Sequence, residues 1–386
     1  MQPPPVIRWT EGGEARSARW RSERGAPPPT KVMVVDDTIT ADEAQGLAGQ
    51  GVALLWRGDF HNARQMLTAI AHRLDRAPRK GKKVAAPSSR MDAFNAERQA
   101  RAQRARTLGM LLVPLEADYT TPLRRAPDYR EAFLEAYGPG DEPSVVSLRE
   151  LQGVVGAHEW RRKGVDVKAL GAKIHPHYGV FAPVRSEYVD LAMKAPLPAA
   201  LANNSLAFDI GTGTGVLAAV LARRGVARVI ATDLDPRALA CARENIERLG
   251  LSATVEVVLA NLFPEGRAPL VVCNPPWVPA RPSSPLEHGI YDFESRMLKG
   301  FLQGLAAHLS PGGEGWLILS DLAVHLGLRS HDEMLASIAA AGLVVVGHLD
   351  AKPTHPRSSD VADPLYGARK AEVTSLWRLA AGAIVP

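Results

Sequence analysis

Cysteine is scarce in this sequence: Cys241 and Cys273 are the only two among 386 residues. Two thiols cannot build a disulfide framework, and they cannot form a four-ligand zinc site by themselves. Each lies inside a predicted helix or strand, so we expect both to be buried thiols. No metal-ligand spacing appears elsewhere in the chain, and we expect no bound metal.

Long apolar runs are also missing. No stretch approaches the roughly 18 residues that a membrane-spanning helix needs, and the N-terminus lacks the apolar core of a signal peptide. We therefore expect a cytoplasmic protein with no membrane partner. The hydrophobic share of 46% and the charged share of 23% are ordinary for a soluble globular chain that can bury a sizeable core.

The length exceeds that of one typical domain, so we expect at least two. Residues 1–30 hold two proline triplets and no apolar periodicity, and we predict a mobile tail there. Residues 31–170 are predicted to form a mainly helical substrate-recognition domain. Its expected helices begin after a capping residue at Thr40 and also cover residues 60–74, 91–109, 127–137 and 147–160.

The formal net charge is only +5, but the basic residues are unevenly distributed. Between His72 and Arg106, eleven Lys and Arg residues face three Asp and Glu residues. This stretch could contact RNA phosphates. A solvated helix face is the better explanation, because alanine and arginine are frequent throughout the chain.

Residues 171–386 have a different pattern, in which short apolar runs alternate with helices. This pattern is typical of an α/β domain with a doubly wound parallel sheet. The seven expected strands are 206–211, 228–233, 254–260, 270–273, 315–320, 343–349 and 373–379. A helix is predicted after the second strand, with Asp235 as its N-cap, Pro236 at its first position and Gly250 at its end.

A glycine-rich motif closes the first of these strands: Asp209-Ile-Gly-Thr-Gly-Thr-Gly215. Alternate glycines let the backbone turn tightly and approach a ligand closely. We predict cofactor contacts from Asp209, Gly211, Thr212, Gly213 and Gly215. Such turns also occur without a ligand, so the glycines alone are a weak signal.

Asp233 ends the second strand, where a carboxylate can accept both hydroxyl groups of a ribose. Neighbouring Asp235 is the better helix cap, which leaves Asp233 for the ligand, with Leu234 beside it. The glycine spacing departs from the dinucleotide pattern G-x-G-x-x-G. S-adenosylmethionine therefore suits the site better than NAD, and an NAD dehydrogenase is disfavoured.

A second motif, Asn274-Pro-Pro-Trp277, follows the fourth strand. We expect it at the sheet edge where open α/β sheets bind ligands. The side-chain oxygen of Asn274 and the carbonyl of Pro275 could accept hydrogen bonds from an NH2 group, and Trp277 could stack on the planar group that bears it. The alternative is a proline-rich turn with a core tryptophan.

Together the two motifs resemble class I S-adenosylmethionine-dependent methyltransferases with an Asn-Pro-Pro-aromatic motif, most of all the release-factor glutamine methyltransferases. The segment Gly179-Val-Phe-Ala-Pro183 followed by Arg185-Ser-Glu187 adds to the likeness. The resemblance implies a seven-stranded Rossmann-like methyltransferase sheet over residues 171–386 and a protein substrate such as a translation factor or ribosomal protein. The implied cofactor residues also include Asn261, Leu262 and Asn274, and the implied substrate residues are Ser186, Glu187, Asn274, Pro275, Pro276 and Trp277.

The sequence departs from the family at two of these positions. Asn261 stands where many relatives have aspartate, and Trp277 replaces the commoner tyrosine or phenylalanine, which leaves the width of the pocket open. Residues 1–170 match no identified substrate domain. Weaker candidates for substrate contacts are His175, His177, Tyr178, His288, Asp292 and Glu294.

Three functions remain open at this point. The first is methylation of an amide nitrogen, best represented by a protein glutamine side chain. The second is methylation of an exocyclic amine of adenine or guanine in rRNA or DNA, which would need a flipped or single-stranded base. The third is a ligand-binding module that has a methyltransferase fold and no activity.

Overall fold

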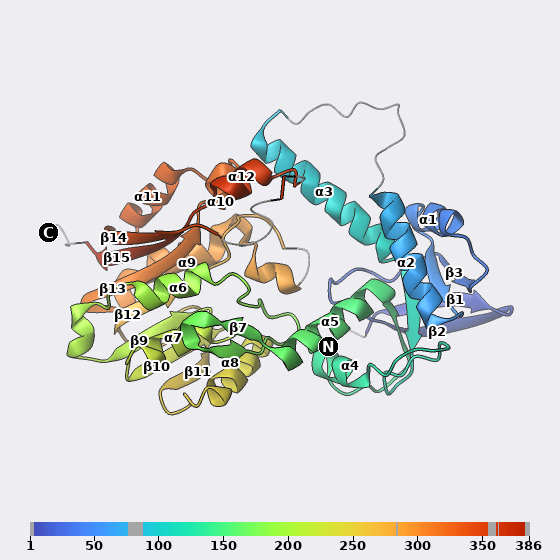
Figure 1. The fold of residues 1–386 in the computed structure, drawn as a ribbon, viewed down its shortest axis with the longest axis horizontal. Coiled ribbons are helices and arrows are strands. Elements are labelled where there is room, and N and C mark those ends of the chain that lie inside the picture. The colour runs from blue at the N-terminus through green and yellow to red at the C-terminus, as the bar shows by residue number, and fades with distance from the viewer. Residues whose placement is uncertain (1–3, 76–87, 283–284, 354–359, 362, 383–386) are drawn as a thin grey trace. The chain divides into compact units, whose positions relative to one another are not determined.

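The computed structural model describes residues 4–75, 88–282, 285–353, 360–361 and 363–382. The chain folds into two compact units (Figure 1). The first comprises residues 1–88 and 95–159, and the second comprises residues 89–94 and 160–386. Within the described residues, no helix combines the length and the apolar character that crossing a bilayer requires.

The first unit contains a six-stranded sheet with the order β1-β2-β6-β5-β4-β3. Its strands are β1 (Val6–Glu11), β2 (Glu14–Trp20), β3 (Val32–Val35), β4 (Ala53–Trp56), β5 (Leu111–Leu115) and β6 (Ser144–Ser147). The helices in this part of the chain are α1 (Ala41–Gly49), α2 (Phe60–Leu74), α3 (Arg90–Leu108), α4 (Arg130–Tyr137) and α5 (Leu148–Lys163). Each helix expected from the sequence is present.

The prediction of a mobile tail over residues 1–30 is wrong for the described part of that segment. Strands β1 and β2 pair there as an antiparallel hairpin, and Ile7 and Trp20 are buried in the core of the first unit. The turn is made by Gly12 and Gly13, with φ of +60° and +83°. A Gly-Gly pair between two runs of alternating polarity is a hairpin signal that could have predicted it.

The expectation of a mainly helical N-terminal domain needs a similar correction, because it omitted the whole six-stranded sheet. Strands β3 to β6 are runs of four or five residues, and every residue of β4, β5 and β6 is buried. Hydrophobic periodicity cannot distinguish so short a buried run from part of a helix. The unit is therefore α/β.

The second unit contains the seven-stranded sheet that the sequence predicts, with the order β11-β10-β9-β12-β13-β15-β14. Its strands are β9 (Leu206–Ile210), β10 (Arg228–Asp233), β11 (Val255–Leu259), β12 (Ala268–Cys273), β13 (Leu309–Ser320), β14 (Leu343–Ala351) and β15 (Thr374–Ala381). Strand β15 runs antiparallel to both of its neighbours, and the other pairs are parallel. A separate two-stranded sheet joins β7 (Val165–Val167) to β8 (Ala172–Ile174).

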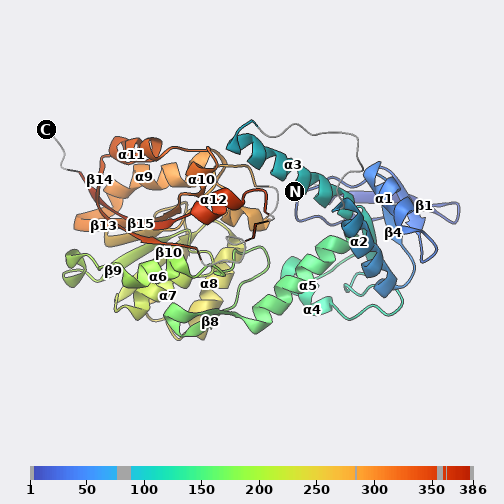
Figure 2. The same ribbon diagram turned by 45° about the horizontal axis from the view of Figure 1, so that its top comes forward.

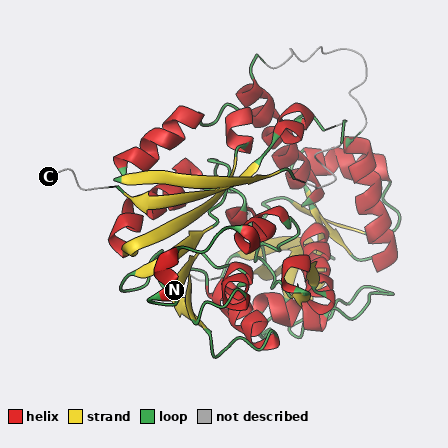
Figure 3. Cartoon of the chain, turned by 60° about the vertical axis from the view of Figure 1, so that its left-hand side comes forward, coloured by secondary structure: helices red, strands yellow, loops and turns green. Residues whose placement is uncertain are grey.

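Helices cover both faces of this sheet (Figures 2 and 3). The helices of the second unit are α6 (Glu187–Lys194), α7 (Val216–Arg223), α8 (Pro236–Arg248), α9 (Arg296–His308), α10 (Leu322–His325), α11 (His331–Ala340) and α12 (Tyr366–Ala371). Residues of α6, α7 and α8 pack into one buried cluster with the strands, and residues of α9 and α11 pack into the other. Both predicted thiols, Cys241 and Cys273, are buried and free.

The strand register places the two sequence motifs next to each other. Ile210, the last residue of β9, pairs with Cys273 of β12 on one side and with Thr232 of β10 on the other. Gly211 and Asn274, the first residues after β9 and β12, therefore lie side by side at the sheet edge. Asp233 is the last residue of β10, on the other side of β9. The strand order reverses between β9 and β12, which is where open α/β sheets bind ligands.

Candidate active site

The loop after β9 has the backbone that its glycines predict. Gly211, Gly213 and Gly215 all have positive φ, at +71°, +56° and +81°. A side-chain carbon at Gly211 would lie 2.3 Å from the terminal methyl group of Met297, whereas nothing lies within 4 Å of the same position at Gly213. The Met297 side chain therefore fills the space beside Gly211, whereas the space beside Gly213 is empty.

The side chain of Asp209 fixes the conformation of this loop through hydrogen bonds. Its Oδ2 accepts hydrogen bonds from the Thr212 hydroxyl at 2.6 Å and from the backbone N–H of Ala218, in the first turns of α7, at 3.0 Å. The carboxyl group is only 1% exposed, and burial raises its pKa to about 6. Its other oxygen, Oδ1, is buried and has no hydrogen-bond partner among the described residues.

Asp233 joins the second strand to the glycine loop. Its Oδ2 accepts from the backbone N–H of Gly213, and its Oδ1 accepts from the backbone N–H of Asp235, both at 3.0 Å. Asp235 caps α8, as expected, by accepting from Arg237 N–H. Asp233 is thus less free than the sequence suggested, although a carboxylate has about four acceptor positions and two remain.

The neighbouring candidates lie at the same edge. Leu234 is 60% exposed, an unusual position for a leucine, and Asn261 is exposed in the loop after β11. Leu262 has φ of +65°, and its carbonyl accepts from the Thr232 hydroxyl of β10. Positive φ in a non-glycine residue is strained and concentrates at functional sites.

Asn274 and Trp277 contact each other within the second motif. The indole N–H of Trp277 donates to Oδ1 of Asn274 at 2.8 Å. Pro275 is buried, and Asn274 and Pro276 are half-buried. Trp277 packs against buried residues of both helical layers.

Ser186 and Glu187 begin helix α6, close to the second motif through Arg185. The guanidinium group of Arg185 lies 4.7 Å from the centre of the Trp277 ring and donates to Oε1 of Glu187 at 2.6 Å. The Ser186 side chain makes no capping hydrogen bond. The sequence predicted Glu187 but missed Arg185, because the contact with Trp277 joins segments far apart in the chain.

Asp292 and Glu294, two of the weaker candidates, shape the loop before α9. The buried carboxylate of Asp292 accepts from the backbone N–H groups of Met297 and Leu298, each at 3.0 Å, which caps α9. Glu294 and the following Ser295 both have positive φ. Asp292 therefore has a structural role that also positions Met297 over Gly211.

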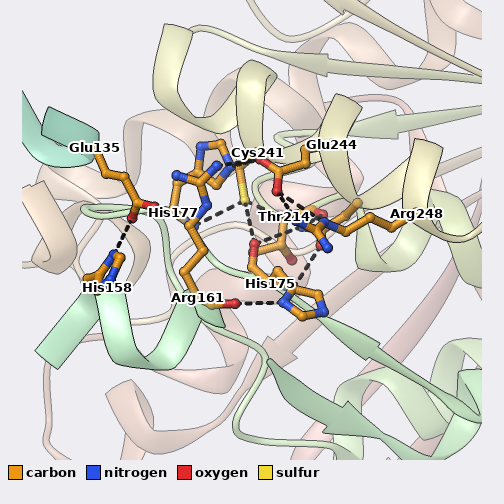
Figure 4. A network of polar contacts seen from close by, with 10 residues as sticks. Glu135, His158, Arg161, His175, His177, Thr214, Cys241, Glu244 and Arg248 are labelled. Carbon is orange, nitrogen blue, oxygen red and sulfur yellow. Dashed lines mark hydrogen bonds and ion pairs between the residues drawn. The ribbon is translucent and has the colours of Figure 1, made fainter. Parts of the chain in front are cut away.

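His175 and His177 belong to a polar network on helix α8 (Figure 4). Glu244 accepts from Arg161 and Arg248, and the His177 ring lies 2.7 Å from it. Burial alone would raise the pKa of Glu244, but these hydrogen bonds lower it to about 2. The buried Asn245 links the network to the glycine loop, because its amide donates to the carbonyls of both His175 and Thr214.

The His175–Tyr178 segment is therefore linked to the glycine loop through the side chain of Asn245. Tyr178 lies under the guanidinium group of Arg237, also on α8. These contacts give the segment a structural role, and we assign it no substrate contact. His288 lies in a short 3-10 turn over Pro285–Gly289.

The residues of this edge fit the head and ribose of S-adenosylmethionine. Asp209 Oδ1 is a buried carboxylate oxygen that still lacks a donor, as an amino acid ammonium group would supply. The open space at Gly213 would be filled by any side chain. Asp233 retains acceptor capacity for hydroxyl groups, and Leu234 offers an exposed apolar side chain for a planar ring.

One pocket among the described residues lies elsewhere, in the first unit. It has a volume of about 660 Å³ between the β1–β2 hairpin and β3, and Arg8, Arg16, Lys31 and Trp9 are among its lining residues. Arg16 is paired with Glu14. None of the predicted site residues lines this pocket.

The basic stretch 72–106 is partly neutralised where it is described. Arg73 pairs with Asp42, Arg104 with Asp75, and Arg101 with Glu97 one helical turn away. Residues 76–87, which hold five of its basic residues, lie outside the described part of the chain.

Comparisons with known proteins find similarity to methyltransferases. Residues 193–275 match the family model for ribosomal protein L11 methyltransferase (PrmA). The chain is 34% identical to a release factor glutamine methyltransferase from Cereibacter sphaeroides over 36% of this chain and 53% of that protein. It is 33% identical to the release factor glutamine methyltransferase of Caulobacter vibrioides over 45% of this chain and 62% of that protein.

A shorter match, 52% identical over 69 residues, is to a ribosomal protein L11 methyltransferase from Pelotomaculum thermopropionicum and covers 17% of this chain and 22% of that protein. The chain thus spans between about a fifth and three-fifths of these relatives' length. Among solved structures, a geranyl diphosphate methyltransferase in complex with SAM has a TM-score of 0.38 at 13% identity, over 56% of this chain and 97% of that one. The family-model match lies in the second unit, whose sheet has the seven strands that the sequence predicts.

Proposed function

We propose that this protein is an S-adenosylmethionine-dependent N-methyltransferase whose acceptor is a planar amide nitrogen, best represented by a glutamine side chain of a protein. The observation that carries the proposal is the register of β9 and β12. It places the glycine loop and Asn274 on adjacent strand ends, so a cofactor on the first would lie next to an acceptor on the second.

Each residue of this edge then has a distinct role. Asp209, the Gly211–Gly215 loop and Asp233 would hold the cofactor, with Leu234, Asn261 and Leu262 around its base. Asn274 and Pro275 would hold the acceptor's NH2 group through their oxygens. When bound, S-adenosylmethionine supplies an electrophilic methyl group on a sulfonium centre, which the acceptor nitrogen attacks with release of S-adenosylhomocysteine.

The chemical difficulty lies with the acceptor, because the lone pair of an amide nitrogen is delocalised into its carbonyl group. Hydrogen bonds from both N–H groups to Asn274 and Pro275 favour a more pyramidal nitrogen with a directed lone pair. The same prearranged acceptors stabilise the positive charge that develops on nitrogen, whose proton then passes to solvent. Fixing the geometry contributes several kcal/mol, within the roughly 7–11 available to well-oriented reactants.

A protein substrate is also the simplest inference from the relatives, which are named for a release factor and for a ribosomal protein. The acceptor itself is tested with methyl-labelled cofactor and a cell lysate, followed by separate protease and nuclease digestions. Labelled protein that releases volatile methylamine on strong acid hydrolysis would support an N-methyl amide. Label that disappears with nuclease would contradict it.

A nucleic-acid acceptor is the second candidate, and one observation favours it. Arg8, Arg16 and Lys31 surround the pocket of the first unit together with the half-buried Trp9, a combination that can bind phosphates and stack on a base. The same nuclease experiment decides between the two acceptors. Purified release factor and ribosomal RNA serve as the two defined probes.

A further inference from the structure

Two residues hold the side chain of Trp277 in place: Arg185 contacts the face of its ring, and Asn274 binds its indole N–H. The Arg185 guanidinium group lies 4.7 Å from the ring centre, and the indole N–H is bound to Oδ1 of Asn274. The rest of the side chain packs against buried residues on both sides of the sheet. The indole therefore has little freedom to rotate.

Arg185 is itself fixed by two buried carboxylates. Its Nε donates to Glu187, and its Nη1 lies 3.0 Å from Oε1 of Glu372. The side chains of Glu187 and Glu372 are 5% and 3% exposed, and a carboxylate buried this deeply is costly without a paired cation. Ser320, at the end of β13, donates to the same oxygen of Glu372.

We propose that Arg185 is a positioning residue for the methyl-acceptor site, acting on Asn274 through Trp277. The proposal rests on the function proposed above. An indole nitrogen can only donate, so only the oxygen of the Asn274 amide can face it, and the contact fixes which way the amide points. That oxygen keeps a second lone pair for the acceptor nitrogen.

The arrangement also bears on the class of substrate. Arg185 covers one face of Trp277, so that face cannot serve as the stacking surface that the sequence suggested. A nucleobase depends on such stacking more than a small aliphatic amide does. The cluster also retains two buried polar atoms without partners among the described residues, Nη2 of Arg185 and Oε2 of Glu187.

The same unit offers a matched control for Arg185. The guanidinium group of Arg224 lies 5.5 Å from the ring centre of Trp316 and donates to the carbonyls of Ala192 and Ala195. Like Arg185 and Trp277, this pair is an arginine stacked on a tryptophan. Neither Arg224 nor Trp316 belongs to the proposed acceptor site. Arg224→Gln should lower the melting temperature and leave turnover unchanged.

The test compares Arg185→Gln, Trp277→Phe and their double variant, with purified release factor as the acceptor probe. We expect each single variant to lower kcat at least tenfold while the Kd for S-adenosylhomocysteine stays within about twofold. The double variant should be no slower than the worse single variant, because both changes act through Asn274. Arg185→Lys, which keeps the cation but loses the planar fork, should restore kcat only in part.

Fluorescence provides a readout that does not depend on methyl transfer. Subtracting the emission of Trp277→Phe from that of the wild type isolates Trp277, and the same subtraction is made in the Arg185→Gln background. A changed difference spectrum is expected if Arg185 stacks on Trp277, and an unchanged spectrum would overturn the contact.

The outcomes separate this inference from the proposed function. If the wild type labels neither release factor nor any lysate protein, the proposed function fails, and the fluorescence result still decides the Arg185 contact. If the wild type is active and Arg185→Gln behaves like Arg224→Gln, the positioning role is wrong. If Arg185→Gln does not fold, Arg185→Lys decides the question. A full kcat in that variant would overturn the proposal that the planar guanidinium group of Arg185 positions Asn274.

Discussion

The carboxylate of Asp233 accepts a hydrogen bond from the backbone N–H of Gly213 at 3.0 Å. This bond joins the end of one strand to the loop that follows its neighbour, so two elements that the sequence presents as separate ligand contacts form one unit. A change at either residue should therefore affect both the loop and the ligand.

The glycine loop allows two matched substitutions. Gly211→Ala and Gly213→Ala both place a side chain at positive φ, but only the first meets a neighbour, the end of the Met297 side chain. We expect each to cost about 1–2 kcal/mol of unfolding free energy from backbone strain. Because the end of a methionine side chain moves easily, adding Met297→Ala to Gly211→Ala should recover little of the lost unfolding free energy. Substantial recovery in chemical denaturation would show that crowding, not φ, sets the cost.

Asp209 should make stability depend on pH. Its folded-state pKa of about 6 lies above the ordinary value of 3.8, so its contribution is fully present below about pH 3.8 and is lost as the pH rises through 6. Relative to the wild type, Asp209→Asn should gain up to about 3 kcal/mol between pH 4 and pH 8. Denaturant unfolding at the two pH values measures this difference.

The same substitution should harm cofactor binding. Charged Asp209 attracts the ammonium group of S-adenosylhomocysteine, so wild-type affinity should rise between pH 5 and pH 7 and then level off. Asp209→Asn should bind weakly with little change over that range. Equal affinity of the two proteins at pH 7 would contradict the placement of the ammonium group.

Glu244 should stabilise α8 and the segment that precedes α6. Its hydrogen bonds lower its pKa to about 2, so its stabilisation is present above about pH 4.5 and is lost as the pH falls toward 2. We expect Glu244→Gln to lower the melting temperature at pH 7 and to differ less from the wild type at pH 3. The control is Glu256→Gln, which breaks an exposed pair with Arg228 and should change little.

Deleting residues 1–30 should destabilise the first unit, contrary to what a mobile tail would imply. The deletion removes β1 and β2, together with the bidentate pair between Glu11 and Arg57, and exposes the partner edge of β6. Limited proteolysis should then cut the first unit faster while the second stays resistant. Unchanged proteolysis of the first unit would show that the hairpin is dispensable.

The sequence was most informative where periodicity and turn residues agreed. All seven strands of the second unit and the α8 helix, with Asp235 as its cap, are present as predicted. The first-unit sheet was missed because its strands are short, and because the hairpin carries Arg and Glu on its exposed positions. At the site, Asp209, Asp233 and Asn274 follow recognisable motifs. Arg185, Glu372 and Met297 reach the site through tertiary contacts that no local pattern reveals.

The central claim is that Asn274 orients the acceptor nitrogen while the glycine loop and Asp233 hold the cofactor. The most direct test measures turnover and S-adenosylhomocysteine affinity for Asn274→Ala and Asp233→Ala side by side. Asp233→Ala should lose roughly 1–3 kcal/mol of binding energy, because its hydrogen bonds to the ligand and to Gly213 are lost. Asn274→Ala should keep near-normal affinity and lose at least ~10²-fold in turnover. Near-normal turnover in Asn274→Ala, or a loss of cofactor binding as large as that of Asp233→Ala, would contradict the account.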